Sequence, residues 1–303
     1  MHRNFKDELI YQWKTGGMHI KLIGINIIIF LFINILLVIG QLSVPRGTEN
    51  SFMDIINTFF SLNGSLKGVL RQPWGLITSI FSHYGFFHLA FNMVFLYFMG
   101  KIFLTYFSGK RMLYTYILGG IAGGLLQIFA YSVFPVFEGV SSYIVGASGG
   151  LNAIFMAAAF YRPHEIIYLF GRFKIKLIAL ALIFILMDIL QMGSGGNVAH
   201  FAHIGGAIFG VISIQHLQSK YNIVTLVENT VNRFTQLFKR KSYLKVKKGG
   251  RDSNIHSQTD EEYNLRKKQK QEEIDKILEK ISKSGYESLT AKEKQILFDK
   301  SQE

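Results

Sequence analysis

The chain has 303 residues, of which 49% are hydrophobic, and its formal net charge is +13. It contains no cysteine, which excludes disulfides, thiolate metal sites and a cysteine nucleophile. The positive charge lies around long apolar segments and in the C-terminal part. That pattern is typical of cytoplasmic loops of membrane proteins, and it excludes nucleic acid as the expected partner.

The composition divides the chain into two parts. Residues 1–217 hold long apolar runs with few charges, whereas residues 218–303 carry 19 of the 33 Lys and Arg and 13 of the 20 Asp and Glu. The first apolar run begins only at Leu22, is too long for a signal peptide and is followed by no small-residue cleavage site. We therefore expect a membrane domain followed by a charged, soluble tail.

A helix that spans a bilayer needs about 20 apolar residues. After an N-terminal arm of residues 1–21, six segments are expected to be spans: 22–42, 86–107, 113–134, 145–161, 177–192 and 198–217. The fourth is short, as expected for a helix that begins inside the membrane. The predicted fold class is an all-α polytopic membrane protein with six transmembrane helices and a helical tail.

The distribution of lysine and arginine predicts the orientation. The N-terminal arm and the loops after the second and fourth spans are basic, whereas the opposite loops, 135–144 and 193–197, have no Lys or Arg. The positive-inside rule places both termini in the cytoplasm, and the six-span plan suits a bacterial inner membrane. Loop 43–85 has apolar patches, so we expect it to fold on itself or to lie in the membrane interface.

The tail is predicted to have two sections. Residues 218–258 form a basic juxtamembrane linker whose cluster Lys239-Arg240-Lys241 favours anionic lipid headgroups. Residues 259–303 are expected to form a charged helical hairpin, with capping patterns at Thr259 and Thr290 and a helix end at Gly285. The hairpin either binds an unknown cytoplasmic partner or is a solvated helix pair without one.

Two polar residues lie in short glycine-rich motifs on apolar segments. Ser148 lies in Gly-Ala-Ser-Gly-Gly at the start of the fourth span, and His203 lies in Ala-His-Ile-Gly-Gly near the start of the sixth. Both are expected at a similar depth below the outer surface. Polar side chains are costly there and are usually kept for function, and a serine beside a histidine base is the minimal set for acyl transfer. The alternatives are a helix-packing motif and a structural histidine.

Three further polar residues lie within the expected spans. His88 and Asn92 are four residues apart and share a helix face, where they form either an oxyanion site or interhelical hydrogen bonds. Asp188 is expected about as deep as His203. It either completes a catalytic triad by orienting the imidazole, or it lines a hydrated cavity or pairs with His200.

The motifs Gly-Ala-Ser-Gly, Ala-His-x-Gly-Gly and His-x-x-x-Asn, on the fourth, sixth and second spans, resemble those of the rhomboid family of intramembrane serine proteases. The resemblance covers roughly residues 20–217 and implies a rhomboid-like bundle with no cofactor or metal. It also implies a Ser–His dyad that cleaves transmembrane protein substrates near the outer membrane face. Ser148 would be the nucleophile and His203 the general base.

The resemblance assigns supporting roles as well. His88, Asn92 and the Ser148 amide would form the oxyanion hole, and His83 would fix the first loop. Gly206 and Gly210 would be close-packing glycines. The chain departs from the family pattern at Trp74-Gly75, where an arginine often follows the tryptophan, and at Asn152, where an aromatic residue often stacks on the histidine. Asn152 is expected to hydrogen-bond His203 instead.

Two rival functions fit some of these residues. A membrane metalloenzyme would use His83, His88, His200 and His203, with Asp188 as a further ligand. A catalytically inactive rhomboid-like scaffold would bind transmembrane helices without cleaving them. The rivals differ from a protease in whether Ser148 reacts with a fluorophosphonate, and in whether chelators abolish activity.

Overall fold

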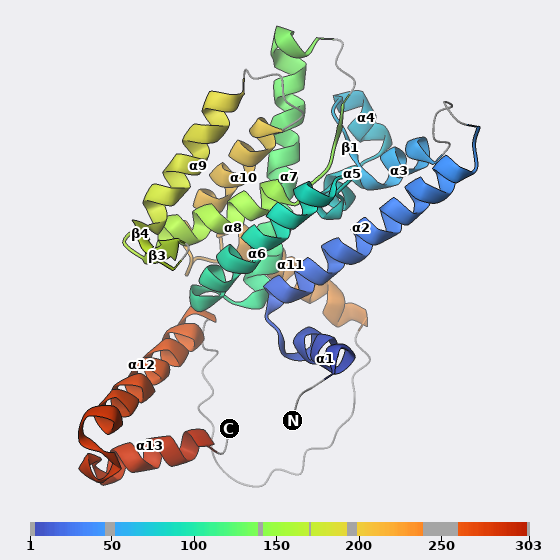
Figure 1. The fold of residues 1–303 in the computed structure, drawn as a ribbon. Helices are drawn as coiled ribbons and strands as arrows, with labels where there is room; N and C mark the ends of the chain where they lie inside the picture. Colours follow the sequence, from blue (N-terminus) through green and yellow to red (C-terminus); the bar gives the residue numbers. More distant parts are fainter. Residues whose placement is uncertain are drawn as a thin grey trace. The chain divides into compact units, whose positions relative to one another are not determined.

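The structure, a computed structural model, describes residues 4–45, 52–138, 142–169, 171–192, 199–238 and 260–301 (Figure 1). The chain divides into two compact units: residues 1–104 with 109–242, and residues 105–108 with 243–303. The predicted lipid-binding cluster at 239–248 and the predicted cap at Thr259 lie outside the described residues.

The N-terminal arm is itself helical. Helix α1 covers Phe5–Thr15, and the Asn4 side chain caps it by accepting a hydrogen bond from the Asp7 amide at 2.8 Å. Helix α2 covers Met18–Leu42, so the first apolar helix begins earlier than the predicted boundary at Leu22.

Loop 43–85 folds on itself, which was one of its two predicted states. It contains α3 (Met53–Phe60), strand β1 (Leu62–Asn63), α4 (Leu66–Arg71), α5 (Gly75–Thr78) and a 3₁₀ turn, η1 (Ser79–Phe81). The indole of Trp74 stacks on Phe59 and donates its N–H to the Thr58 carbonyl at 2.8 Å. These contacts link the start of α5 to α3.

Six further helices complete the first unit. They are α6 (Phe86–Tyr106, whose last residues are grouped with the second unit), α7 (Gly109–Val133), α8 (Ser148–Tyr161), α9 (Leu177–Gln191), α10 (His200–Ser213) and α11 (Ile223–Phe238), with a 3₁₀ turn, η2 (Pro135–Phe137), after α7. Among the described residues, α2, α6 and α7 are long and apolar enough to cross a membrane, and α9 and α10 are shorter apolar helices. The structure thus contains three candidate spans, and the six-span count stays a prediction.

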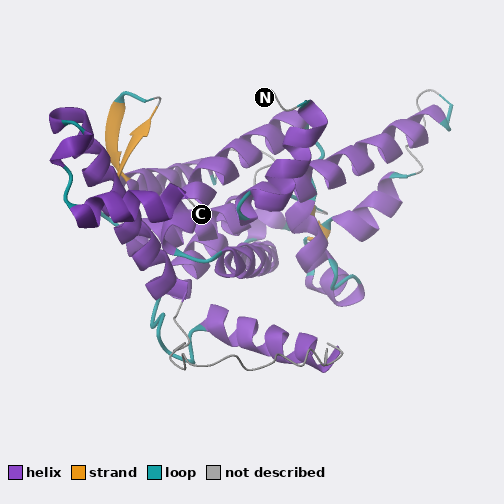
Figure 2. Cartoon of the chain, turned by 90° about the horizontal axis from the view of Figure 1, so that it is seen from below, coloured by secondary structure: helices purple, strands orange, loops and turns teal. Residues whose placement is uncertain are grey.

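The prediction of an all-α fold was wrong in detail, because two short antiparallel two-stranded sheets, the second of them a hairpin, accompany the helices (Figure 2). Strand β1 pairs with β2 (Tyr143–Ile144), with Leu62 opposite Ile144. Strand β3 (Ile166–Leu169) pairs with β4 (Phe173–Lys176). This hairpin is rich in β-branched and aromatic residues, and Gly171 in its turn has φ +69°, a conformation that glycine adopts without strain.

Helices α7, α8 and α10 form the centre of the first unit, with α9 beside α8 and α10 (Figure 1). Almost all of α8 is buried, from Gly149 to Ala159. A methyl group on Gly206 would overlap the Gly149 carbonyl oxygen, and one on Gly210 would overlap that of Ala153. Glycine at both positions therefore lets the backbones of α8 and α10 touch, as the sequence predicted.

A buried polar chain ties the first loop to the bundle. Asn26 of α2 donates to the Tyr116 hydroxyl at 3.2 Å, and that hydroxyl donates to the Ile80 carbonyl at 3.1 Å. Ile80 lies in η1, which precedes His83. The Ser79 carbonyl of the same turn accepts a hydrogen bond from the Gly146 amide at 2.9 Å, so these bonds together hold the loop next to the residues that precede Ser148.

The second unit contains α12 (Asp260–Ser284), a 3₁₀ turn, η3 (Tyr286–Ser288), and α13 (Ala291–Ser301). Helix α12 ends before Gly285, as predicted, and Gly285 has φ +76°. The predicted capping box forms, since the Thr290 amide donates to Glu293 at 2.7 Å and the Glu293 amide donates to the Thr290 hydroxyl at 3.3 Å. The Thr290 amide and the Lys280 ammonium together lower the pKa of Glu293 to about 2.

Candidate active site

Ser148 is the first residue of α8, immediately after a sharp turn. Gly146 has φ +133°, and a methyl group there would meet the His88 ring at 2.9 Å, so this turn requires glycine. The first amides of a helix have no intrahelical partner and carry a partial positive charge. The half-buried Ser148 hydroxyl therefore lies beside backbone N–H groups that suit a developing negative charge.

His203 lies on α10 with its Nε2 atom 2.8 Å from the Ser148 Oγ. This distance is within the range expected of a nucleophile and its general base. The His203 side chain is 18% exposed. The two residues are 55 positions apart in sequence, and the close contact of α8 and α10 at Gly206 brings them together.

Asp188 of α9 contacts two histidines through one oxygen. Its Oδ1 atom lies 2.8 Å from the Nδ1 of His203 and 2.8 Å from the Nδ1 of His200. The Asp188 side chain is 15% exposed. The sequence left a triad role and pairing with His200 as alternatives, and the structure contains both contacts at once.

Asn152 does not replace the family's aromatic residue in the way the sequence suggested. Its side-chain amide donates to the Ser148 carbonyl at 3.0 Å, one turn back on α8. Among the described residues, Asp188 rather than Asn152 contacts the His203 Nδ1. The expected Asn152–His203 hydrogen bond was therefore wrong, because a helical amide can satisfy itself on the preceding turn.

His88 and Asn92 lie on one face of α6, as predicted, but their side chains differ in their surroundings. The His88 ring lies against Gly146, next to the Ser148 turn. The Asn92 amide donates to the His88 carbonyl at 2.9 Å and approaches His83 Nε2 at 3.2 Å. In this arrangement the Asn92 side chain contacts His83, whereas the His88 ring directly adjoins the turn.

His83 connects the first loop to the turn before Ser148. Its Nε2 accepts a hydrogen bond from the Ala147 amide at 3.4 Å, and its ring packs edge-on against His88. Burial, with His88 adding to it, lowers the pKa of His83 to about 3, although the Phe81 carbonyl opposes this. His83 is therefore a neutral acceptor at ordinary pH, which agrees with its predicted role in fixing the loop.

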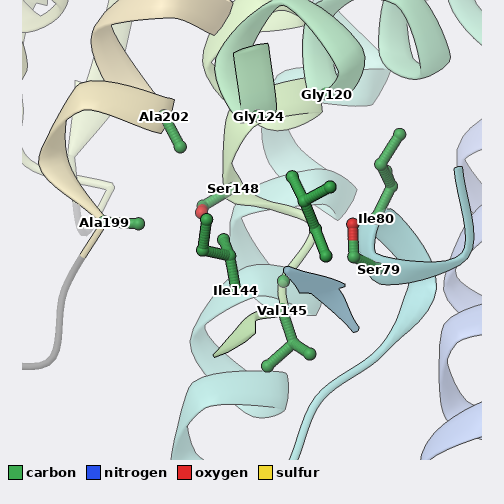
Figure 3. Close-up of a pocket in the computed structure, with 12 residues that line it drawn as sticks. Ser79, Ile80, Gly120, Gly124, Ile144, Val145, Ser148, Ala199 and Ala202 are labelled. Atoms are coloured by element: carbon green, nitrogen blue, oxygen red, sulfur yellow. The ribbon is translucent and has the colours of Figure 1, made fainter. Parts of the chain in front are cut away.

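A small cavity adjoins Ser148 (Figure 3). It measures about 20 Å³, which is room for one water molecule. Its wall includes Ser79 and Ile80 from the loop, Gly120 and Gly124 from α7, and Ala202 from α10. Gly120 and Gly124 thus leave space beside the hydroxyl.

The predicted four-histidine metal set does not gather in one place. In the described part of the chain, the potential ligands that converge are Asp188, His200 and His203, whose ligand atoms lie within 4.8 Å of one another. Hydrogen bonds from both histidines to Asp188 account for this cluster, and His203 also contacts Ser148.

Sequence reasoning missed one supporting residue. Gln127 of α7 is buried, and its side-chain oxygen accepts a hydrogen bond from the Ala202 amide at 3.2 Å, in the first turn of α10. The signal was present in the sequence, because Gln127 is the one amide side chain of the apolar segment 113–134, where an unsatisfied polar group is costly. Gln127 fixes the turn that carries His203.

The fold and site define an integral membrane protein of mostly helical structure, with a serine and a histidine paired at the start of two apolar helices. Comparison with known families agrees: residues 70–219 match the rhomboid domain. The chain belongs to the rhomboid family. Residues 257–303 match a separate family of unknown function (DUF6576).

Curated relatives share the membrane region. The chain is 30% identical over 185 residues to RHOMBOID-like protein 12, mitochondrial, of Arabidopsis thaliana, covering 57% of this chain and 54% of the relative. It is 27% identical over 187 residues to rhomboid protease GluP of Bacillus subtilis, covering 60% of this chain and 33% of the relative. It is 27% identical to presenilin-associated rhomboid-like protein, mitochondrial, of Bos taurus, covering 50% of this chain and 40% of the relative. The chain spans about half or less of the length of these relatives.

Proposed function

We propose that the protein is an intramembrane serine endopeptidase that hydrolyses peptide bonds of transmembrane protein substrates near the outer membrane face. The observation that carries this proposal is the 2.8 Å contact between Ser148 Oγ and His203 Nε2. A hydroxyl and an imidazole in this geometry form an activated nucleophile. One relative, GluP, is named as a protease.

The reaction begins when Ser148 Oγ attacks the substrate carbonyl and its proton passes to His203 Nε2. The carbonyl electron pair moves onto oxygen, where the first amides of α8 and the His88 ring stabilise it. The tetrahedral species collapses, and the leaving amine takes the proton from Nε2. Water then hydrolyses the acyl-enzyme by the same steps, with His203 as its base.

The proposal includes a placement in the membrane. Both termini face the cytoplasm, the six apolar segments cross or enter the bilayer, and the Ser148 end of α8 faces outward. The membrane proposed is a bacterial inner membrane, on the six-span plan and the basic loops. The relatives of this chain include mitochondrial proteins as well as a protein from Bacillus subtilis.

Other partners follow from the charge pattern. The basic segment at 239–248 binds anionic lipid headgroups, and the hairpin after residue 259 binds a cytoplasmic protein. Neither nucleic acid nor a cofactor takes part. Single-span substrates with glycine or serine near the outer end of the span are the preferred class, because their helices unwind most easily.

The test is labelling of the purified protein with a fluorophosphonate, together with cleavage of a single-span reporter substrate. Labelling and cleavage are expected for the wild type and expected to be absent from Ser148→Ala and His203→Ala. A folded wild-type protein that neither labels nor cleaves, but still binds the reporter helix, would instead be an inactive scaffold.

A further inference from the structure

We propose that Asp188 is a positioning residue that converts the Ser148–His203 pair into a triad. The inference rests on the proposed function and concerns how the general base is prepared. A rhomboid-type dyad would not require this carboxylate. The chain nevertheless places it 2.8 Å from the His203 ring nitrogen that faces away from Ser148.

Asp188 determines which ring nitrogen of His203 carries the proton. An ionised carboxylate only accepts hydrogen bonds, so Nδ1 must carry the ring proton in the contact with Asp188. Neutral imidazole has one N–H, and Nε2 is therefore left as an acceptor. This is the nitrogen that lies 2.8 Å from Ser148 Oγ. Asp188 thus selects the form of His203 that can take the serine proton.

Asp188 also stabilises the positive charge that His203 acquires during the reaction. When the proton moves from Ser148 Oγ to His203 Nε2, the imidazole becomes a cation, while Asp188 keeps its negative charge and gains no proton. The carboxylate side chain is 15% exposed, so the attraction between the two charges is screened less than it would be in water. The carboxylate consequently stabilises the state formed during attack more than the resting state.

Asp188 is itself held in place by a second histidine. His200 lies one helical turn before His203, is 7% exposed and contacts the same Oδ1 atom at 2.8 Å. The rings of His200 and His203 are nearly perpendicular, at 81°. Two N–H donors from α10 therefore fix one oxygen from α9. His200 restrains the carboxylate so that it stays on His203.

This arrangement also explains a departure from the family pattern. An aromatic residue that would restrain the His203 ring is absent, and Asn152 at that position is bonded to the Ser148 carbonyl instead. The ring still needs a restraint to keep Nε2 on Ser148. Asp188 supplies one on the opposite edge of the ring.

The experiment compares Asp188→Asn and Asp188→Ala with wild type and with Leu190→Ala, a change at a residue of α9 that is 69% exposed. In detergent, we would measure the rate of fluorophosphonate labelling, kcat and KM for the reporter, and the thermal midpoint. The corresponding carboxylate is worth about 10⁴ in kcat in soluble triad proteases. We expect both Asp188 variants to label at least about 100-fold more slowly. Their kcat should fall while KM stays nearly constant, and Leu190→Ala should behave as wild type.

A chemical rescue separates positioning from a structural role. Formate added to Asp188→Ala should restore part of the labelling rate, because a small carboxylate can occupy the vacated place beside Nδ1. Formate should not restore the labelling of Ser148→Ala or His203→Ala. A slow Asp188→Ala enzyme that formate leaves unchanged would assign Asp188 a structural role and overturn the proposal.

Asp188→Asn keeps the side-chain shape and serves as the test if Asp188→Ala fails to fold. Labelling of Asp188→Asn within threefold of the wild-type rate would also overturn the triad. Failure of the wild type itself to label would instead overturn the proposed protease function. The two failures are therefore distinguishable.

Discussion

Around Ser148, polar side chains are bonded to one another and to the backbone that carries the nucleophile. Asn92 approaches His83, His83 accepts from the Ala147 amide, and Asn152 donates to the Ser148 carbonyl. Each bond satisfies a group that would be costly to bury alone. Each also restrains the turn at residues 146–148, so the geometry of the serine depends on residues that never touch substrate.

His83 predicts how stability depends on pH. Its pKa is about 3 in the folded protein against an ordinary value of 6.5, so the unfolded chain binds more protons below pH 6.5. The contribution of this group to folding stability is therefore complete above pH 6.5 and is lost as the pH falls toward 3. The slope from this group approaches about 1.4 kcal/mol per pH unit.

The measurement is the free energy of unfolding in detergent between pH 7.5 and 4.5, for wild type and His83→Gln. Glutamine keeps an acceptor without a titratable group, so its profile should be flatter over this interval. Parallel profiles for the two proteins would contradict the assignment of the pH dependence to His83.

His88 and Asn92 are expected to respond differently to truncation. His88→Ala should lower kcat about 10²–10³-fold with little change in KM, which is the usual effect of losing one oxyanion donor. Asn92→Ala should lower stability as well, because it removes the bonds to the His88 carbonyl and His83. Phe91→Ala, at a position of α6 that is 74% exposed, is the control. Equal kinetic effects without a stability difference would show that Asn92 is an oxyanion donor instead.

At the scale of elements, the close contact of α8 and α10 brings the serine and the histidine together. Gly206→Ala would press a methyl group against the Gly149 carbonyl, which cannot move without shifting the start of α8. We expect a loss of about 1–3 kcal/mol in stability and a larger fractional loss in labelling rate. Ile208→Val, at a position of the same helix that is 52% exposed, should change neither the stability nor the labelling rate. A Gly206→Ala enzyme with wild-type labelling would contradict the role of this contact.

The apolar helices were predictable from sequence because apolar run length is a local property. The paired positions of Ser148 and His203 were predictable from their similar depth on two expected spans. The start of α8 at Ser148, rather than at Val145, was not predictable, since β2 and the Gly146 turn depend on pairing with the distant β1. The Asp188 contacts depend on the rotation of α9 about its axis, which hydropathy does not determine.

At the scale of the whole molecule, every described contact of the paired side chains lies in the first unit. This bears on the rival metalloenzyme. Both nitrogens of His203 already have hydrogen-bond partners, on Ser148 and on Asp188. We therefore expect EDTA or 1,10-phenanthroline to leave cleavage of the reporter unchanged within twofold. Chelator-sensitive cleavage that survives Ser148→Ala would instead favour a metal mechanism.

The C-terminal unit is predicted to be dispensable for the chemistry. Truncation after Ser242 removes α12 and α13 and leaves Ser148, His203 and Asp188 with all the partners described for them. In detergent, the truncated enzyme should therefore label and cleave within threefold of the full chain, with Ser148→Ala in the truncated background as its blank. The tail would then matter only where its own partner or the lipid surface is present. A tenfold fall in kcat in detergent would show that the tail acts on the active site directly, and would assign it a regulatory role in catalysis.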